Sequence, residues 1–168
     1  IGVVLVSSQN TIISVGYNGP VRKCPHSDTP EYLEHLYENL LTSDDRTLLT
    51  TQHNVLNAKK FVEKFAGQKD CPRKILNAPS GERLELCPCA HAERNALANA
   101  NINGNTTTDS IMYCWCGVPC HECTTQIIQS RVKTVVCLEN PQGDYSASSR
   151  GLFKMSGVEL VEIDVEDI

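Results

Sequence analysis

The chain has 168 residues, a length typical of one domain, and 40% of them are hydrophobic, which is enough to bury an ordinary core. The formal net charge is −5, and the 15 Lys and Arg residues are scattered, with no basic run longer than Lys59-Lys60. A nucleic-acid partner is therefore not expected, because phosphate contacts require a basic surface. No apolar run reaches the roughly 18 residues of a membrane span, so no membrane contact is expected either.

The cysteine content indicates metal binding. The chain has nine cysteines, an odd number, and several stand at C-x-C or C-x-x-C spacing near histidines. This pattern favours metal sites in a reducing compartment over a disulfide framework, so we expect a cytoplasmic protein.

The N-terminal residues predict a β-hairpin. Apolar, β-branched residues fill 3–6 and 11–15, and the four polar residues between them have turn chemistry. The next stretch, Gly16-Tyr17-Asn18-Gly19-Pro20, predicts a loop whose glycines let a ligand approach the backbone closely. Because the chain opens on Ile1 with a strand already under way, we expect that residues are missing before it.

Residues 27–85 predict a helical insert. One helix is expected from Pro30, and a second from a cap at Ser43 or Asp44 as far as Gly67.

The end of the insert predicts a small hairpin. Cys71-Pro72 breaks the helical pattern, and residues 73–77 and 82–86 flank a turn-rich stretch of Ala, Pro, Ser and Gly.

Helices and strands alternate in the rest of the chain. The expected elements are a helix from Ala90 to about Ile102, a strand at Ser110–Trp115, a helix at Pro119–Ser130, a strand at Val132–Leu138, a short helix at 148–156 and a strand at Val158–Ile163. This alternation predicts an α/β fold with parallel strands in its second half, forming one domain over residues 1–168.

Two short motifs carry the chemistry. His91-Ala92-Glu93 offers an imidazole and a carboxylate, and Pro119-Cys120-His121-Glu122-Cys123 offers two thiols. Zinc prefers tetrahedral nitrogen and sulfur ligands, and a catalytic zinc keeps one position for water. We therefore expect three ligands, His91, Cys120 and Cys123, at two helix N-termini whose dipoles stabilise thiolates. The combined pattern is typical of zinc-dependent nucleobase deaminases.

Glu93 is expected to be a proton shuttle, because a carboxylate in the fourth zinc position would exclude the water. It would take a proton from the attacking water, pass it to ring N3 of a cytosine, and then protonate the leaving amino group. A closed structural zinc site and a redox C-x-x-C pair are the alternatives, which a lone C-x-x-C would favour.

These motifs resemble those of the cytidine deaminase-like superfamily and, within it, the deoxycytidylate (dCMP) deaminases. The matching segments are Gly16-Tyr17-Asn18-Gly19, His91 to Ala96, Pro119 to Cys123 and Ile127 to Val136. Only the region 27–85 falls outside the resemblance, as an enlarged form of a family-variable stretch. The resemblance implies a three-layer sandwich, with a central mixed five-stranded sheet, helices on both faces and a helix before the first strand.

The resemblance also implies an activity and a substrate site. Family members hydrolyse dCMP to dUMP and ammonia, which feeds thymidylate synthesis. It implies that Asn18 contacts the sugar or base, that Arg22 or Lys23 holds the 5′-phosphate, and that Tyr145 lines the same pocket. Many members are homo-oligomers, often hexamers, and some are activated by dCTP and inhibited by dTTP.

The chain departs from the family pattern in two places. Pro20 follows Gly19 directly and Lys23 replaces a later glycine, which leaves regulation by dCTP and dTTP open. The usual Thr-x-x-Pro-Cys is replaced by a segment containing Trp115 and Cys116, which we expect near the base. A 5-substituted cytosine such as 5-methyl-dCMP is therefore an alternative substrate, beside a core-packing role for Trp115.

Five further side chains predict a second metal site. Some family members carry a structural zinc, and the candidate ligands here are Cys24, His26, Cys71, Cys87 and Cys89. We expect a closed zinc site of Cys24, Cys71 and Cys89 with His26 or Cys87 as the fourth ligand. The alternative is that these are ordinary buried cysteines.

Rival functions fall into two classes. The first is deamination of another substrate, such as dCTP, free cytidine, guanine, a tRNA adenine or a pterin-like ring. Arg22 and Lys23 favour a monophosphate, and the acidic charge weighs against tRNA. The second is a non-catalytic zinc protein that binds nucleotides, which would have no need of Glu93.

Overall fold

The computed structural model describes residues 2–79, 82–139 and 146–165. The chain divides into two compact units, one formed by residues 1–18 with 90–168 and the other by residues 19–89. The residue range of the second unit includes the predicted insert 27–85. That these residues are an insert within a single domain stays a prediction.

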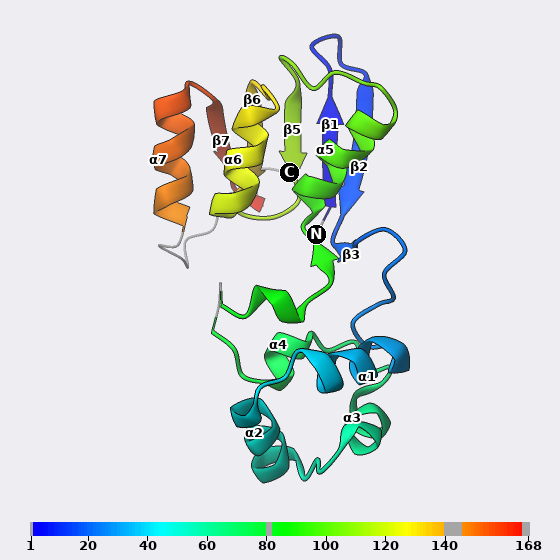
Figure 1. Cartoon of the computed structure of the whole chain (residues 1–168). Coiled ribbons are helices and arrows are strands. Elements are labelled where there is room, and N and C mark those ends of the chain that lie inside the picture. Colours follow the sequence, from blue (N-terminus) through cyan, green and yellow to red (C-terminus); the bar gives the residue numbers. More distant parts are fainter. Residues whose placement is uncertain (1, 80–81, 140–145, 166–168) are drawn as a thin grey trace. The chain divides into compact units, whose positions relative to one another are not determined.

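The first unit is built on a five-stranded sheet of order β2-β1-β5-β6-β7 (Figure 1). Strand β1 (Gly2–Val6) pairs antiparallel with β2 (Ile12–Tyr17) and with β5 (Ile111–Cys114). Strand β5 pairs parallel with β6 (Thr134–Leu138), which pairs parallel with β7 (Glu159–Ile163). The predicted hairpin, the mixed sheet and the parallel second half are thereby confirmed.

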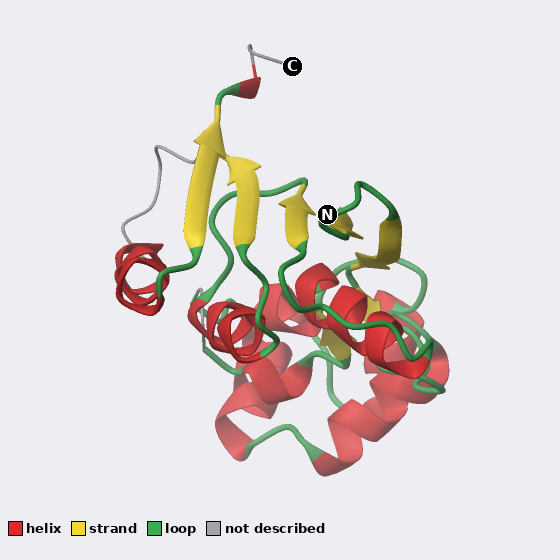
Figure 2. Ribbon diagram, turned by 90° about the horizontal axis from the view of Figure 1, so that it is seen from above, coloured by secondary structure: helices red, strands yellow, loops and turns green. Residues whose placement is uncertain are grey.

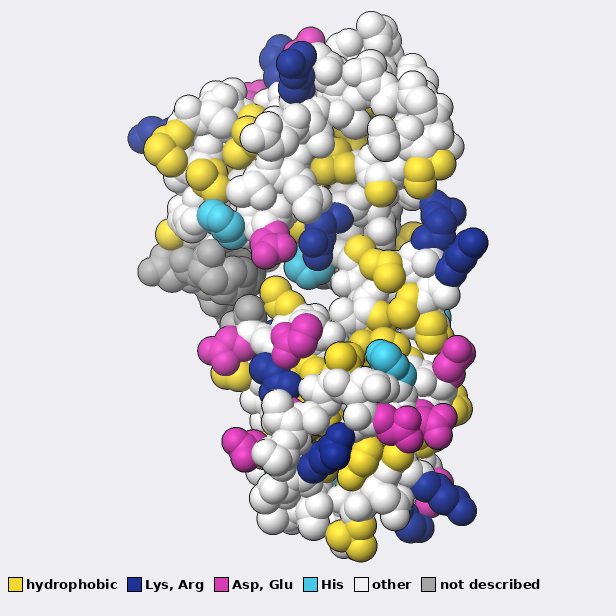
Figure 3. Space-filling view, viewed as in Figure 1, with side chains coloured by type: hydrophobic (Ala, Val, Ile, Leu, Met, Phe, Trp, Pro, Cys, Tyr) yellow, Lys and Arg dark blue, Asp and Glu magenta, His cyan; other side chains and the backbone are white. Residues whose placement is uncertain are grey.

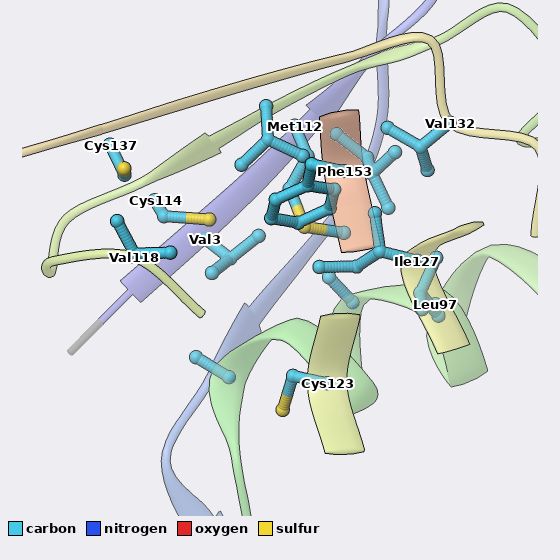
Figure 4. Close-up of a cluster of buried hydrophobic side chains, with 14 residues drawn as sticks. Val3, Leu97, Met112, Cys114, Val118, Cys123, Ile127, Val132, Cys137 and Phe153 are labelled. Atoms are coloured by element: carbon cyan, nitrogen blue, oxygen red, sulfur yellow. The ribbon is translucent and has the colours of Figure 1, made fainter. Parts of the chain in front are cut away.

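Three helices pack on one face of this sheet: α5 (Ala92–Ile102), α6 (His121–Gln129) and α7 (Ala147–Ser156) (Figure 2). Strand residues such as Val3 and Met112 point toward the helices (Figure 4) and, with Leu5, belong to the core of the unit. Among the described residues of this unit no helix covers the opposite face, so the second helical layer and the helix before β1 stay predictions.

Asparagine side chains on α5 and just after it secure this segment to the edge strand β2. Asn99 Nδ2 donates to the carbonyl of Val15 at 2.9 Å, and Asn105 Nδ2 donates to that of Ile13 at 3.0 Å. The Ser14 hydroxyl is buried and donates to the Ala96 carbonyl at 2.8 Å. Helix and strand are therefore joined by hydrogen bonds along their length.

The second unit is helical, as predicted. Its elements are α1 (Pro30–Asn39), α2 (Ser43–His53), α3 (Ala58–Phe65), the single turn α4 (Pro72–Ile75) and the 3₁₀ turn η1 (Leu84–Leu86). Its own apolar core includes Leu33, Leu36, Leu49, Phe61 and Leu86, which are fully buried. A short strand pair, β3 (Gly19–Pro20) with β4 (Cys89–Ala90), forms a second sheet.

The expected long helix ending at Gly67 is wrong, because the chain forms two helices there. Helix α2 is capped by Thr42, whose side chain and that of Asp45 form a reciprocal capping box, and not by Ser43 or Asp44. Asn54 then takes a left-handed conformation with φ of 55°, which ends α2, and the Asn57 side chain caps α3.

The hairpin expected over 73–77 and 82–86 is also wrong. Pro72 stands in the first turn of α4, where its fixed φ favours a helix start. The Arg73 guanidinium donates to the carbonyls of Pro79 and Glu82 at 2.8 and 2.6 Å, which holds the connection in place of strand pairing.

The loop expected from Gly16 begins later than predicted. Gly16 and Tyr17 belong to β2, where they pair with Val3 and Gly2. No helix in the described parts of the chain is both long enough and apolar enough to cross a membrane.

Candidate active site

Three side chains from two helix N-termini converge in the first unit. His91 is the N-cap of α5, Cys120 is the N-cap of α6, and Cys123 lies in the first turn of α6. The Nδ1 atom of His91 is 3.4 Å from the Sγ atom of each cysteine. Within the described residues this is the one group of three or more possible metal ligands whose donor atoms lie within 4.8 Å of one another.

The geometry of this group fits zinc. Bond lengths of about 2.3 Å to sulfur and 2.0 Å to nitrogen at tetrahedral angles separate the two ligand atoms by about 3.5 Å. The observed His91 to cysteine distances of 3.4 Å match that separation. Three ligands of this kind leave one tetrahedral position open, as a catalytic zinc site requires.

Glu93 lies beside this group without belonging to it. Its side chain is buried, with 4% exposure, and burial raises the pKa of its carboxyl above the usual range. The carboxylate interacts electrostatically with His91 and Cys120, yet no oxygen of it joins the group of ligand atoms. A buried carboxyl beside an open metal position is placed to move protons.

Cys120 is predisposed to be a thiolate. Its contact with the Cys123 thiol, followed by those with His91 and with the Cys123 N–H in the first turn of α6, holds the pKa of Cys120 below its usual range.

Asn18 lies against the first turn of α5. It follows β2 directly, and its Oδ1 atom accepts a hydrogen bond from the Ala92 N–H at 2.9 Å. The structure therefore brings one predicted substrate residue next to His91 and Glu93.

The other predicted substrate residues are not brought together in the same way. Arg22 and Lys23 are exposed side chains of the second unit, and Tyr145 lies outside the described residues. Trp115 is 60% exposed and lines an apolar hollow of about 610 Å³ beside Tyr113 and Val4. A substrate contact by any of the four stays a prediction.

All five cysteine and histidine residues assigned to a second metal belong to the second unit, which spans residues 19–89. Cys24, Cys71, Cys87 and Cys89 are all half-buried and free. Burial, and after it the charges of these four thiols, raises the pKa of Tyr32 to about 12. No three of their sulfur atoms lie within 4.8 Å of one another, so the structure does not bring them into ligand geometry. Burial raises the pKa of the Cys87 thiol, which also interacts electrostatically with Cys71 and Cys89, and this favours Cys87 over His26 as the fourth member.

Two residues near the site were missed by sequence reasoning. Arg94 Nη1 is 3.6 Å from Glu122 Oε2, and its buried Nε has no hydrogen-bond partner. Asn95 Nδ2 donates to the Tyr17 carbonyl at 2.8 Å. Both directly follow Glu93, but only the fold shows what their side chains reach.

The surface agrees with the charge pattern of the sequence. On the face seen in Figure 3, the described Lys and Arg side chains are interrupted by acidic and uncharged ones and do not merge into one basic surface.

An α/β fold with a His-Cys-Cys group at two helix N-termini and a buried glutamate defines a zinc-binding deaminase domain. Residues 1–139 match the family described as the cytidine and deoxycytidylate deaminase zinc-binding region, and the chain belongs to this family.

Three curated relatives are named as deoxycytidylate deaminases, one of them as a probable one. The deoxycytidylate deaminase of Schizosaccharomyces pombe is 35% identical over 91 residues, which cover 54% of this chain and 27% of that protein. That of Homo sapiens is 26% identical over 160 residues, covering 94% and 64%. A probable deoxycytidylate deaminase of Drosophila melanogaster is 28% identical over 155 residues, covering 90% and 56%. The chain spans less than two thirds of each.

Solved structures share the fold. A dCMP deaminase from the cyanophage S-TIM5, solved in complex with dCMP and dUMP, has a TM-score of 0.53 at 16% identity, covering 96% of this chain and 79% of that one. A diaminohydroxyphosphoribosylaminopyrimidine deaminase/5-amino-6-(5-phosphoribosylamino)uracil reductase from Thermotoga maritima has a TM-score of 0.50 at 19% identity, covering 99% and 30%.

Proposed function

We propose that this protein hydrolyses dCMP to dUMP and ammonia. The observation that carries the proposal is the His91-Cys120-Cys123 group with the buried Glu93 beside it, in a chain of the deaminase family. The deoxycytidylate deaminase names of three relatives support the choice of substrate.

The residues of the chain divide the work between binding and proton transfer. His91, Cys120 and Cys123 would hold zinc, which supplies Lewis acidity toward water when bound. Glu93 takes a proton from the attacking water and gives it to ring N3. It then takes the second water proton, from the hydroxyl on C4 as the carbonyl forms, and passes it to the departing amino group. Water and dCMP are consumed, and dUMP and ammonia are formed. The raised pKa of Glu93 suits a group that must both accept and return a proton.

Asn18 offers the substrate a donor. Because its Oδ1 already accepts the Ala92 N–H, the Nδ2 atom is the group left for a nucleotide. A contact of Asn18 with the sugar or base therefore requires an acceptor, such as a hydroxyl or carbonyl oxygen. Arg22 or Lys23 would hold the 5′-phosphate, and Trp115 and Tyr145 would line the pocket.

The proposal extends to the setting of the enzyme. It is a cytoplasmic homo-oligomer, a hexamer by resemblance, that supplies dUMP for thymidylate synthesis. Its effectors would be dCTP and dTTP, although Pro20 and Lys23 depart from the regulatory pattern.

Release of ammonia from purified, zinc-loaded protein tests the function. The substrates to compare are dCMP, 5-methyl-dCMP, dCTP and deoxycytidine. We expect turnover of dCMP, and a Glu93→Gln variant that keeps its zinc but loses roughly 10²- to 10⁴-fold in kcat. If only 5-methyl-dCMP is turned over, the substrate is 5-methyl-dCMP and not dCMP. If none of the four is turned over, the proposed activity is wrong, and the alternative is a zinc protein that binds nucleotides without catalysis.

A second, structural zinc in the cluster of Cys24, Cys71, Cys87 and Cys89 completes the proposal. All four thiols belong to the second unit and interact electrostatically with Tyr32, and a Cys₄ set is typical of closed structural sites.

Metal analysis tests the second zinc. We expect two zinc ions per chain in the unmodified protein and one in a Cys71→Ser variant. Cys137→Ser is the matched control, because that buried thiol lies in the sheet core, and it should retain two. One zinc per chain in the unmodified protein contradicts the second site.

A further inference from the structure

The turn that carries His91 and Glu93 has no cap from its own sequence. His91 occupies the N-cap position of α5, but its side chain makes no capping hydrogen bond. The first N–H groups of a helix have no partner within the helix, and an uncapped first turn frays. The Ala92 N–H is satisfied instead by Asn18, 74 residues earlier in the chain.

A second side chain bonds in the opposite direction. Asn95, one turn into α5, donates through Nδ2 to the carbonyl of Tyr17 at 2.8 Å. Asn18 thus accepts from the backbone of α5, while Asn95 donates to the backbone beside Asn18. One bond holds Ala92, between His91 and Glu93, and the other holds Asn95, two residues after Glu93.

Gly16 brings the two backbones close enough for these bonds. A Cβ atom at Gly16 would lie 2.1 Å from the Ala92 carbonyl oxygen and 2.4 Å from the Ala96 nitrogen. The backbone at the end of β2 is therefore in direct contact with α5, and residues 16–18 cannot shift without moving the turn.

We infer that Asn18 and Asn95 are positioning residues that hold His91 in register with Cys120 and Cys123. Neither is one of the three grouped ligands, so they act through the first turn of α5, which directly follows His91. The inference rests on zinc occupying the His91 site, as proposed above, and extends the role of Asn18 beyond substrate contact. It assigns an acceptor role to Asn18 and a donor role to Asn95.

Substitution by aspartate separates these roles, because aspartate keeps the acceptor of asparagine and lacks the donor. Asn18→Asp retains the bond to Ala92, whereas Asn95→Asp loses the bond to Tyr17. Asn99→Asp is the matched control, since Asn99 makes the same kind of bond from α5 to Val15, one turn further from the zinc site.

Zinc affinity, measured by competition with a chelator, is the readout, together with the visible spectrum of the Co²⁺-loaded protein. We expect Asn95→Asp and Asn18→Ala to lose roughly 10- to 100-fold in zinc affinity, as is usual for groups that orient metal ligands. Asn18→Asp should bind zinc about as tightly as the unmodified protein. Asn99→Asp should lower the melting temperature while leaving the zinc affinity and the Co²⁺ spectrum unchanged.

Two results overturn the inference: equal losses of zinc affinity in Asn95→Asp and Asn99→Asp, or Asn18→Asp binding zinc as weakly as Asn18→Ala. If Asn18→Ala does not fold, the contrast between Asn18→Asp and Asn95→Asp decides. The measurement uses no nucleotide, so a protein that deaminates no dCMP but shows this contrast defeats the proposed function and supports the positioning roles.

Discussion

At the scale of single residues, the second unit depends on a partly buried ion pair. Asp45 is 8% exposed, and its two oxygens accept from Arg83 Nη1 and Nη2 at 2.9 and 3.0 Å. The hydrogen bonds from Arg83 lower the pKa of Asp45 from 3.8 to about 2. Because the same carboxylate completes the capping box of α2, the pair joins a helix start to the chain near η1.

The lowered pKa of Asp45 predicts a loss of stability in acid. A folded-state pKa below the unfolded value stabilises the protein above about pH 4, and this contribution is lost as pH falls toward 2. Arg83→Gln should reduce the free energy of unfolding by about 1–2 kcal/mol at pH 7. Denaturant unfolding should show this deficit shrinking as the pH approaches 2.

Glu85→Gln is the control for this prediction. Glu85 also accepts from Arg83, at 2.7 Å, but its side chain is 59% exposed. Exposed pairs contribute little, so this variant should unfold close to the unmodified protein. A deficit in Arg83→Gln that stays the same from pH 7 to pH 2 would show that the ion pair is not its source.

At the scale of elements, the contact between β2 and α5 gives Gly16 a different meaning from the one its sequence suggested. The glycine was expected to admit a ligand, but its missing Cβ admits the backbone of α5 at Ala92 and Ala96. From sequence alone the two explanations are indistinguishable, because both require only a residue without a side chain.

Gly16→Ala should therefore be strongly destabilising. The added methyl would meet backbone atoms at 2.1 and 2.4 Å, which cannot rotate away. We expect a loss of at least 1–3 kcal/mol and a lower melting temperature. Gly151→Ala is the control, because nothing lies within 4 Å of its added methyl in α7, and it should stabilise the helix by up to about 1 kcal/mol. Equal melting temperatures for the two variants would contradict the close contact.

The errors over 43–86 have a common physical origin. The helical spacing of the apolar residues continues across Asn54, so the sequence pattern predicted one helix. The left-handed conformation of Asn54 ends α2 there, and the chain forms two helices. Turn-rich residues between two short apolar runs suggested a hairpin, but the carbonyls there are satisfied by the Arg73 side chain. Such tertiary hydrogen bonds leave no local signal in a sequence.

At the scale of the whole molecule, the chemistry was more predictable than the architecture. The ligand types and their spacing limit which residues can bind zinc together, so His91, Cys120 and Cys123 could be chosen before their convergence at 3.4 Å was seen. The division into units 1–18 with 90–168 and 19–89 could not be chosen in this way. It depends on two separate apolar cores, and a sequence does not show which buried residues share a core.

The asparagines on α5 and just after it have a consequence for solubility. A strand at the edge of a sheet offers unpaired backbone groups to any other extended chain, and such edges promote fibrous aggregation. On β2 the carbonyls of Ile13, Val15 and Tyr17 already accept from Asn105, Asn99 and Asn95. A foreign strand would have to displace three amide side chains before it could bind there. The asparagines on and just after the helix that His91 caps thus protect the sheet against growth from that edge.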